Sequence, residues 1–236
     1  RGPMTLVGCG AATLGVVMRI GDFSLPFLYA LFAIPTITVN IGSCITQSWV
    51  AWGLAYIVFL NAELVTSNMM YLTAGTFLKK IDWKKAFIIL LYCAFFNLVG
   101  ALLVGWCFAN SSAFSHLTHD SYLPKIVAKK LARPSELVLL EGILANMFVN
   151  IAILSSILVK DSNAKLWIIL SAISMFVFLS NEHIAANFSS FSIIKFSIVS
   201  DQIANFDIPN ILRHWGVTFI ANLIGGGFLI GLPYAY

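Results

Sequence analysis

The chain has 236 residues, of which 59% are hydrophobic and only 10% are charged, and its mean hydropathy is +0.90. One soluble core cannot bury this much apolar surface, so the composition excludes a soluble domain and predicts an integral membrane protein. The net charge of +4 comes from residues that lie between apolar runs and form no basic face. Nothing therefore points to nucleic acid as a partner.

The apolar runs predict an all-α membrane protein with six transmembrane helices. The stretch from residue 4 to residue 17 comes first and is short for a crossing, so we interpret residues 1–24 as an N-terminal interfacial segment. Residues 25–236 then form a single six-helix transmembrane domain. The crossings are expected at about 25–43, 49–78, 86–109, 134–159, 166–196 and 211–236.

Two kinds of connection join these helices. The polar breaks 79–85 and 160–165 are short enough to join neighbouring antiparallel helices. The connections 110–133 and 197–213 are longer and mix polar with apolar residues, so we expect folded loops at one membrane face. With the N-terminus inside, 8 of the 14 Lys and Arg residues lie on the inner face and 6 on the outer face. This bias predicts a multi-pass protein of the cell membrane with both termini in the cytoplasm.

The fifth apolar segment carries a carboxylate and an imidazole side by side near its middle, at Glu182 and His183. Inserting such a side chain into a membrane costs roughly 2.5 to 3.5 kcal/mol, so these groups normally face a bundle interior or a watered cavity and serve transport. The alternative is a buried Glu and His that satisfy one another across a helix contact.

An internal repeat relates the two halves of the chain. In each half a Glu is followed five residues later by an Asn, and one helix later by an Asn-Leu-x-Gly step. The matching residues are Glu63, Asn68 and Asn97–Gly100 in the first half and Glu182, Asn187 and Asn222–Gly225 in the second. Three crossings separate the copies, so we expect two inverted three-helix repeats, at about 25–110 and 134–236. Chance similarity between two apolar halves is the alternative.

Thr66, Ser67 and Asn68 interrupt the apolar run of the first copy at the place that Ala185, Ala186 and Asn187 occupy in the second. We therefore expect the second and fifth helices to be broken near the midplane. A broken helix presents backbone N–H groups and a positive dipole end, which favours an anion. In an unbroken helix, the Thr and Ser hydroxyls would instead bond to the carbonyl one turn back.

Four motifs in this order resemble those of the formate/nitrite transporter family, over about residues 25–236. They are Ala62-Glu-Leu-Val-Thr66, Gly142-Ile-Leu-Ala-Asn146, Glu182-His-Ile-Ala-Ala-Asn187 and the paired Asn-Leu/Ile-Gly steps. The resemblance implies an aquaporin-like six-helix protomer with broken second and fifth helices. It also implies a homopentamer in which each protomer has its own anion pore.

Residue by residue, the resemblance implies a polar pore set and an apolar constriction. The pore set is His183, similar to the family's central histidine, Thr66 facing it, Lys130, similar to the vestibule lysine, and Asn146 and Asn187. The constriction set is Leu54 and Leu64 on the cytoplasmic side and Phe176 and Val50 on the periplasmic side. Val50 departs from the family, which has an aromatic residue there, so the gate is expected to be wider and substrate size stays open.

The chemistry of a charged solute suggests how such a set works. A bare anion in an apolar constriction carries a large Born penalty. Protonating the anion therefore costs less free energy than moving it through the constriction in its charged form. We expect Lys130 to attract the anion and His183, with Thr66, to share a proton with it. The expected substrates are small monovalent weak-acid anions such as formate or nitrite, with hydrosulfide, acetate and lactate as alternatives.

Glu63 and Glu182 are expected to have structural roles. Glu182 can hold the His183 ring or cap backbone donors of a neighbouring broken helix. The matching Glu63 has no adjacent His, which favours capping.

Other patterns are weaker. His116 and His119 lack a Cys or carboxylate set to complete a metal site, and the four Cys show no C-x-x-C spacing, so no metal or cofactor is expected. His214 is expected to anchor the chain at the membrane interface, as are Trp83 and Trp167. A neutral-solute facilitator is less favoured because the paired Asn-Pro-Ala motifs are absent, and an intramembrane enzyme because no nucleophile and base converge.

Overall fold

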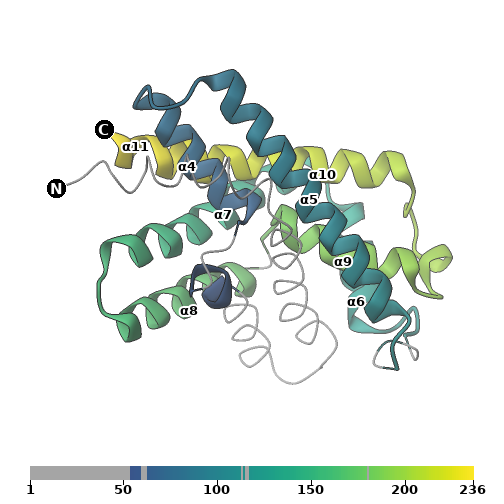
Figure 1. Ribbon diagram of the computed structural model, residues 1–236. Coiled ribbons are helices and arrows are strands. Elements are labelled where there is room, and N and C mark those ends of the chain that lie inside the picture. The colour runs from purple at the N-terminus through teal and green to yellow at the C-terminus, as the bar shows by residue number, and fades with distance from the viewer. Residues whose placement is uncertain (1–53, 60–62, 113, 115–116, 180) are drawn as a thin grey trace.

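The computed structural model describes residues 54–59, 63–112, 114, 117–179 and 181–236, and the elements of this part are all helices (Figure 1). Within it, three helical stretches are long and apolar enough to cross a membrane: Trp83–Ala109, Ser135–Leu158 and Ile208–Ala235. The expected interfacial segment, the first crossing and Val50 lie outside the described residues. The all-α membrane architecture is thus confirmed, and the count of six crossings stays a prediction.

The first described hairpin consists of α4 (Val65–Phe77) and α5 (Trp83–Ala109). Lys79, at the end of α4, adopts a left-handed φ of 55°, a conformation in which helices commonly terminate. Asp82 then starts α5, because its side chain accepts the backbone N–H of Lys84 at 2.9 Å. The short polar break expected at 79–85 therefore joins two neighbouring helices.

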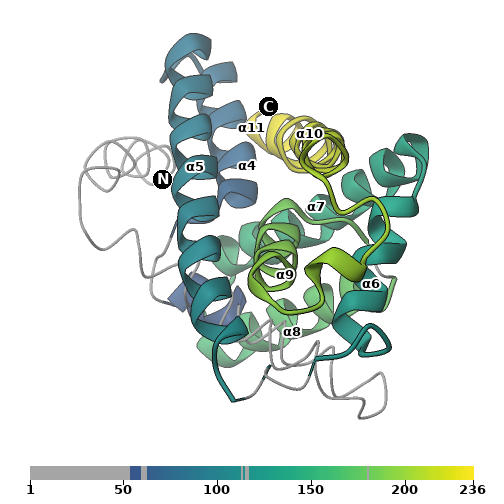
Figure 2. The ribbon, with the colours of Figure 1, turned by 90° about the vertical axis from the view of Figure 1, so that its right-hand side faces the viewer.

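The second hairpin consists of α7 (Ser135–Leu158) and α8 (Ser162–Phe178). Pro134 immediately precedes α7, where a missing backbone N–H costs nothing. Past α8, residues 181–183 are not helical, and α9 (Ile184–Phe196) begins a new helix. Figure 2 looks along α9 and places it centrally, with α5, α6 and α10 around it, and all three contact it.

The two long connections are folded, as the sequence predicts. The first contains α6 (Tyr122–Ala132), and the second contains the short helix η2 (Ser200–Gln202). Their apolar side chains share a core with the ends of α5 and α9. The buried members of this core are Val104, Phe114, Leu117, Leu123, Val127, Leu131, Phe191, Ile193, Ile194, Val199 and Ile203.

The last helices form one continuous rod, drawn in yellow in Figure 1. It consists of α10 (Ile208–Asn222), the π-helical stretch η3 (Leu223–Gly231) and α11 (Leu232–Ala235). The carboxylate of Asp207 starts the rod by accepting the backbone N–H of Asn210 at 2.9 Å, and this bond lowers the pKa of Asp207. The Gly-rich η3 lies against α4 and α7, so its glycines let the helices approach closely, as expected.

Candidate functional site

Two helix starts, at α4 and α9, have the same local structure. The residues before them, Leu64 and His183, are both extended, with φ and ψ of −120° and 127° and of −123° and 124°. In each half an Asn one helix later caps the first N–H: Asn97 Oδ1 accepts from Val65 at 3.1 Å, and Asn222 Oδ1 accepts from Ile184 at 2.9 Å. The Glu and Asn of each repeat also pair, with distances of 2.7 Å for Glu63 and Asn68 and 3.0 Å for Glu182 and Asn187.

His183 and Thr66 meet across the two halves. Nε2 of His183 lies 3.0 Å from Oγ1 of Thr66, and both side chains are buried. Nδ1 of His183 accepts the backbone N–H of Ala186 at 3.4 Å. In the neutral ring the proton then sits on Nε2, so His183 donates to the Thr66 hydroxyl. The structure therefore brings together the two residues that the resemblance paired.

Two asparagines of α7 support this junction, the contact between His183 and Thr66 at the two helix starts. Asn146 Nδ2 donates to the carbonyls of Asn222 at 2.6 Å and of Thr66 at 3.2 Å. Asn150 Nδ2 donates to the same Thr66 carbonyl at 3.1 Å. Asn146, a predicted pore residue, thus ties the backbone at the start of α4 to the end of α10. Asn150 was missed by the sequence reasoning, although it follows Asn146 by one helical turn.

The described residues of the expected constriction lie in the apolar core. Leu54, Leu64 and Phe176 are all buried and belong to one cluster. The Phe176 ring lies against His183, with ring centroids 5.7 Å apart and planes tilted by 41°. An apolar side chain therefore lies directly beside the imidazole.

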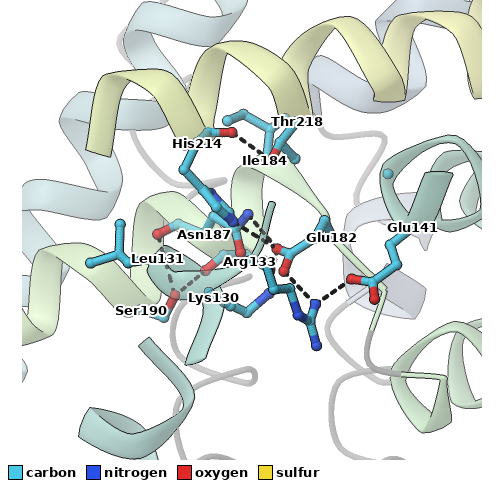
Figure 3. Close-up of polar contacts among 12 residues, drawn as sticks. Lys130, Leu131, Arg133, Glu141, Glu182, Ile184, Asn187, Ser190, His214 and Thr218 are labelled. Carbon is cyan, nitrogen blue, oxygen red and sulfur yellow. Dashed lines mark hydrogen bonds and ion pairs between the residues drawn. The ribbon is translucent and has the colours of Figure 1, made fainter. Parts of the chain in front are cut away.

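A cluster of charged side chains surrounds Glu182 (Figure 3). Oε2 of Glu182 accepts from Lys130 Nζ at 2.5 Å, and Oε1 accepts from Arg133 Nη1 at 2.6 Å. Arg133 also pairs with Glu141 of α7. Glu182 is fully buried, so it needs these partners, because an uncompensated charge at this depth is strongly unfavourable.

The capping role expected for Glu182 is wrong. Its described side-chain partners are other side chains, whereas the N–H groups of Ile184 and Ala186 at the start of α9 are bound by Asn222 and by His183. Glu182 does not cap a helix because Lys130 and Arg133, at the C-terminal end of α6, bind its carboxylate. Arg133 and Glu141 were also missed. Glu141 had a signal, because it is a carboxylate within the fourth apolar run, next to the Gly142 motif.

The expected interfacial position of His214 is also wrong. His214 is fully buried on the inner side of α10, while Trp83 and Trp167 are exposed, as expected. Helix rotation explains the difference, because the face of α10 that carries His214 also carries the buried Thr218, Ala221 and Asn222. A position near the end of an apolar run says nothing about which face a residue occupies.

Comparison with known proteins gives the family. The family model described as formate/nitrite transporter matches residues 15–236. The chain belongs to the formate/nitrite transporter family. It is therefore a membrane transport protein and not an enzyme, and the resemblance of its motifs is confirmed.

Known relatives and solved structures are consistent with this family assignment. The formate channel BtFdhC of Bacillus thuringiensis is 29% identical over 185 residues, covering 77% of this chain and 68% of that protein. The uncharacterized transporter YrhG of Bacillus subtilis is 31% identical over 187 residues, covering 77% and 66%. An FNT family ion channel superposes with a TM-score of 0.83 at 20% identity over 98% of this chain and 93% of the other. A pentameric formate channel with formate bound gives 0.73 at 18% identity over 95% and 96%.

Asn222 offers a test of the junction between the halves. Its side chain accepts from Ile184 and donates to the carbonyls of Gly142 at 2.8 Å and Glu182 at 3.0 Å. Asn222→Ala leaves these buried groups unpaired and should lower the free energy of unfolding by on the order of 3 kcal/mol. Asn97→Ala, which removes the single described bond to Val65, is the matched control. Denaturation in mixed micelles should rank Asn222→Ala as the more damaging, and equal losses would contradict the assignment.

Proposed function

We propose that this transporter is a channel for small monovalent weak-acid anions such as formate and nitrite. The observation that carries the proposal is the buried contact of 3.0 Å between His183 Nε2 and Thr66 Oγ1, where the helix starts of the two halves meet. The formate channel among its relatives supports formate as the first substrate to test. We further propose a homopentamer in the cell membrane with both termini in the cytoplasm, and the pentameric structural neighbour supports the assembly.

Lys130 is the proposed attractor of the anion. Its side chain keeps 15% of its surface exposed although it is paired with Glu182. Arg133 also donates to Glu182, so that the carboxylate does not depend on Lys130 alone for its counter-charge. A cation at the edge of a low-dielectric wall concentrates anions at a mouth. Asn187 donates a second hydrogen bond to Oε2 of Glu182, the oxygen that accepts from Lys130. By holding this carboxylate, Asn187 positions Lys130.

His183 is the proposed proton partner. Its Nε2–H points to Thr66, and an anion that replaces this hydroxyl as acceptor receives a hydrogen bond at a fully buried position. The anion held by this hydrogen bond takes up its proton from water on the acidic side, while the ring stays neutral. The weak acid so formed is uncharged and passes the apolar side chains of Leu54, Leu64 and Phe176, and of Val50, without the Born penalty. Nδ1 accepts from the backbone N–H of Ala186, which keeps the ring oriented while the anion is bound.

Asn146 has a supporting part in this scheme. Because its amide holds the Thr66 carbonyl, it keeps the hydroxyl of Thr66 opposite the imidazole. Glu63 pairs with Asn68 at the start of α4, as Glu182 pairs with Asn187 at the start of α9, and each pair supports its helix start.

Formate flux into proteoliposomes tests the proposal. The wild-type rate should rise as the outside is acidified, and His183→Phe, which removes the donor, should lower it by about 10- to 100-fold, the equivalent of one hydrogen bond to a charged group. His119→Gln, at an exposed loop position, is the control and should leave flux unchanged. Flux that is indifferent to pH and to His183→Phe would refute the mechanism.

The choice of anion is decided by the same assay. Nitrite, hydrosulfide, acetate and lactate make similar demands on Lys130 and His183, so relative rates report the size of the constriction. Glycerol or water flux exceeding that of every anion would instead favour a neutral-solute facilitator.

A further inference from the structure

His214 is a buried histidine that the mechanism above does not use. Its Nε2 lies 3.5 Å from Oε2 of Glu182, and both side chains are fully buried. Among the residues that the structure describes, neither ring nitrogen has a hydrogen-bond partner within ordinary geometry. Figure 3 shows the ring directed from α10 toward the carboxylate. A buried polar ring with both nitrogens unsatisfied is costly, so its position calls for a function.

The ring is held firmly beside Glu182. Phe191 of α9 covers it, with ring centroids 5.4 Å apart. The neighbouring Arg213 fastens α10 to the end of α6, because its guanidinium donates to the carbonyl of Leu131 at 2.9 Å and to Ser135 Oγ at 3.1 Å. The anchor of α10 is therefore the same helix end that carries Lys130 and Arg133.

The charges around the ring nearly balance. The groups facing Glu182 and His214 are Lys130 and Arg133 from α6, Glu141 from α7, Glu182 itself, the neutral Asn187 from α9, and Arg213 from α10, which is turned to backbone carbonyls. Two cations thus offset two carboxylates while the imidazole is neutral. A proton on His214 adds one more positive charge, attracted by the carboxylates and repelled by Lys130 and Arg133. Imidazole is the side chain that changes charge between about pH 5 and about pH 8.

Two donors bind Oε2 of Glu182, and His214 lies beside the same oxygen without a hydrogen bond. Oε2 of Glu182 already accepts from Lys130 at 2.5 Å and from Asn187 at 3.0 Å, and His214 stands next in line at 3.5 Å. A protonated ring forms a charge-assisted bond that is roughly twice as strong as a neutral one. Its approach to Oε2 then weakens the ion pair between Glu182 and Lys130, because the two donors share one acceptor and because their like charges repel.

We propose that His214 is a proton-responsive positioning residue that acts through Glu182 on Lys130. The inference rests on the proposed function. When the imidazole takes up a proton from water, it draws on Oε2 of Glu182 and releases the ammonium of Lys130 to face an incoming anion. His183 acts on the anion itself, whereas His214 changes how readily the anion is captured. Acid therefore improves capture at one site and passage at another.

Tracer exchange of formate in proteoliposomes, with the same pH on both sides, separates the two effects. Between about pH 8 and about pH 5 the apparent KM of the wild type should fall roughly tenfold, the lower end of electrostatic concentration by a charged cleft. His214→Gln and His214→Asn should keep the KM constant within about twofold while the maximal rate still rises with acid. His119→Gln should retain the wild-type KM profile. A KM that falls equally in the His214 variants would overturn the proposal.

A second measurement does not depend on flux. Of the four histidines in the chain, His116, His119 and His183 are replaced by Gln, so that His214 alone remains, and its labelled ring is titrated by NMR. A ring that gains a proton between about pH 8 and about pH 5 supports the proposal, and a ring that keeps one protonation state overturns it. Absence of formate flux in the wild type at any pH would refute the channel instead, and the NMR result would still decide the behaviour of His214.

Discussion

Glu182→Leu should cause the largest loss of stability of any single change near the site. Without the carboxylate, Lys130 loses its described counter-charge while Arg133 keeps Glu141. Removing one partner of a buried ion pair costs about 3 to 5 kcal/mol, a large part of the total stability of a domain. We expect little or no monodisperse protein in detergent, as measured by size-exclusion chromatography and by the midpoint of thermal unfolding. Glu182→Gln, which preserves shape, should also be strongly destabilised.

A double substitution checks that charge is the cause. Lys130→Met removes the cation that Glu182→Gln leaves unpaired, so the pair Lys130→Met and Glu182→Gln should be more stable than Glu182→Gln alone. Glu136→Gln, at an exposed position on the first turn of α7, is the matched control and should be near neutral. A double variant as unstable as the single one would show that Glu182 acts by shape and not by charge.

Gly225→Ala should disrupt the contact between η3 and α7. A Cβ at this position would come within 2.1 Å of the Ile143 carbonyl oxygen, which is backbone and cannot turn aside. Overpacking of this kind typically costs about 1 to 3 kcal/mol, and the rod would have to move away from α7. Because α7 carries Asn146, the displacement should also lower formate flux. Thermal unfolding and flux of the same preparations measure both effects.

Gly216→Ala is the control for this substitution. Gly216 lies in the same rod, and a Cβ there meets nothing within 4 Å. Alanine in a helix interior is more favourable than glycine by about 0.8 to 1 kcal/mol, so Gly216→Ala should leave the protein equally or slightly more stable. If both substitutions have the same sign and size, close approach of the helices is not what Gly225 provides.

Local chemistry determined much of this protein. The excess of apolar residues required a membrane protein, because no arrangement of these side chains could be wetted. The spacing of Glu and Asn in both halves predicted two matching helix starts, since a motif repeated at the same spacing makes the same local hydrogen bonds. The folded connections around α6 and η2 followed from the apolar residues that they carry between the charges. The motifs Ala62–Thr66 and Gly142–Asn146 were among those that indicated the family.

The tertiary structure alone decided which charges meet. Glu182 was expected to cap a helix, yet it pairs with Lys130 and Arg133, which are about fifty residues away in the chain. His214 was expected at the interface, yet the rotation of α10 turns it inward to the same carboxylate. Spacing along a sequence specifies which residues share one helix face, but the partner of that face depends on how helices far apart in the chain pack together. That is why the residues of the junction were foreseeable and the charge cluster beside it was not.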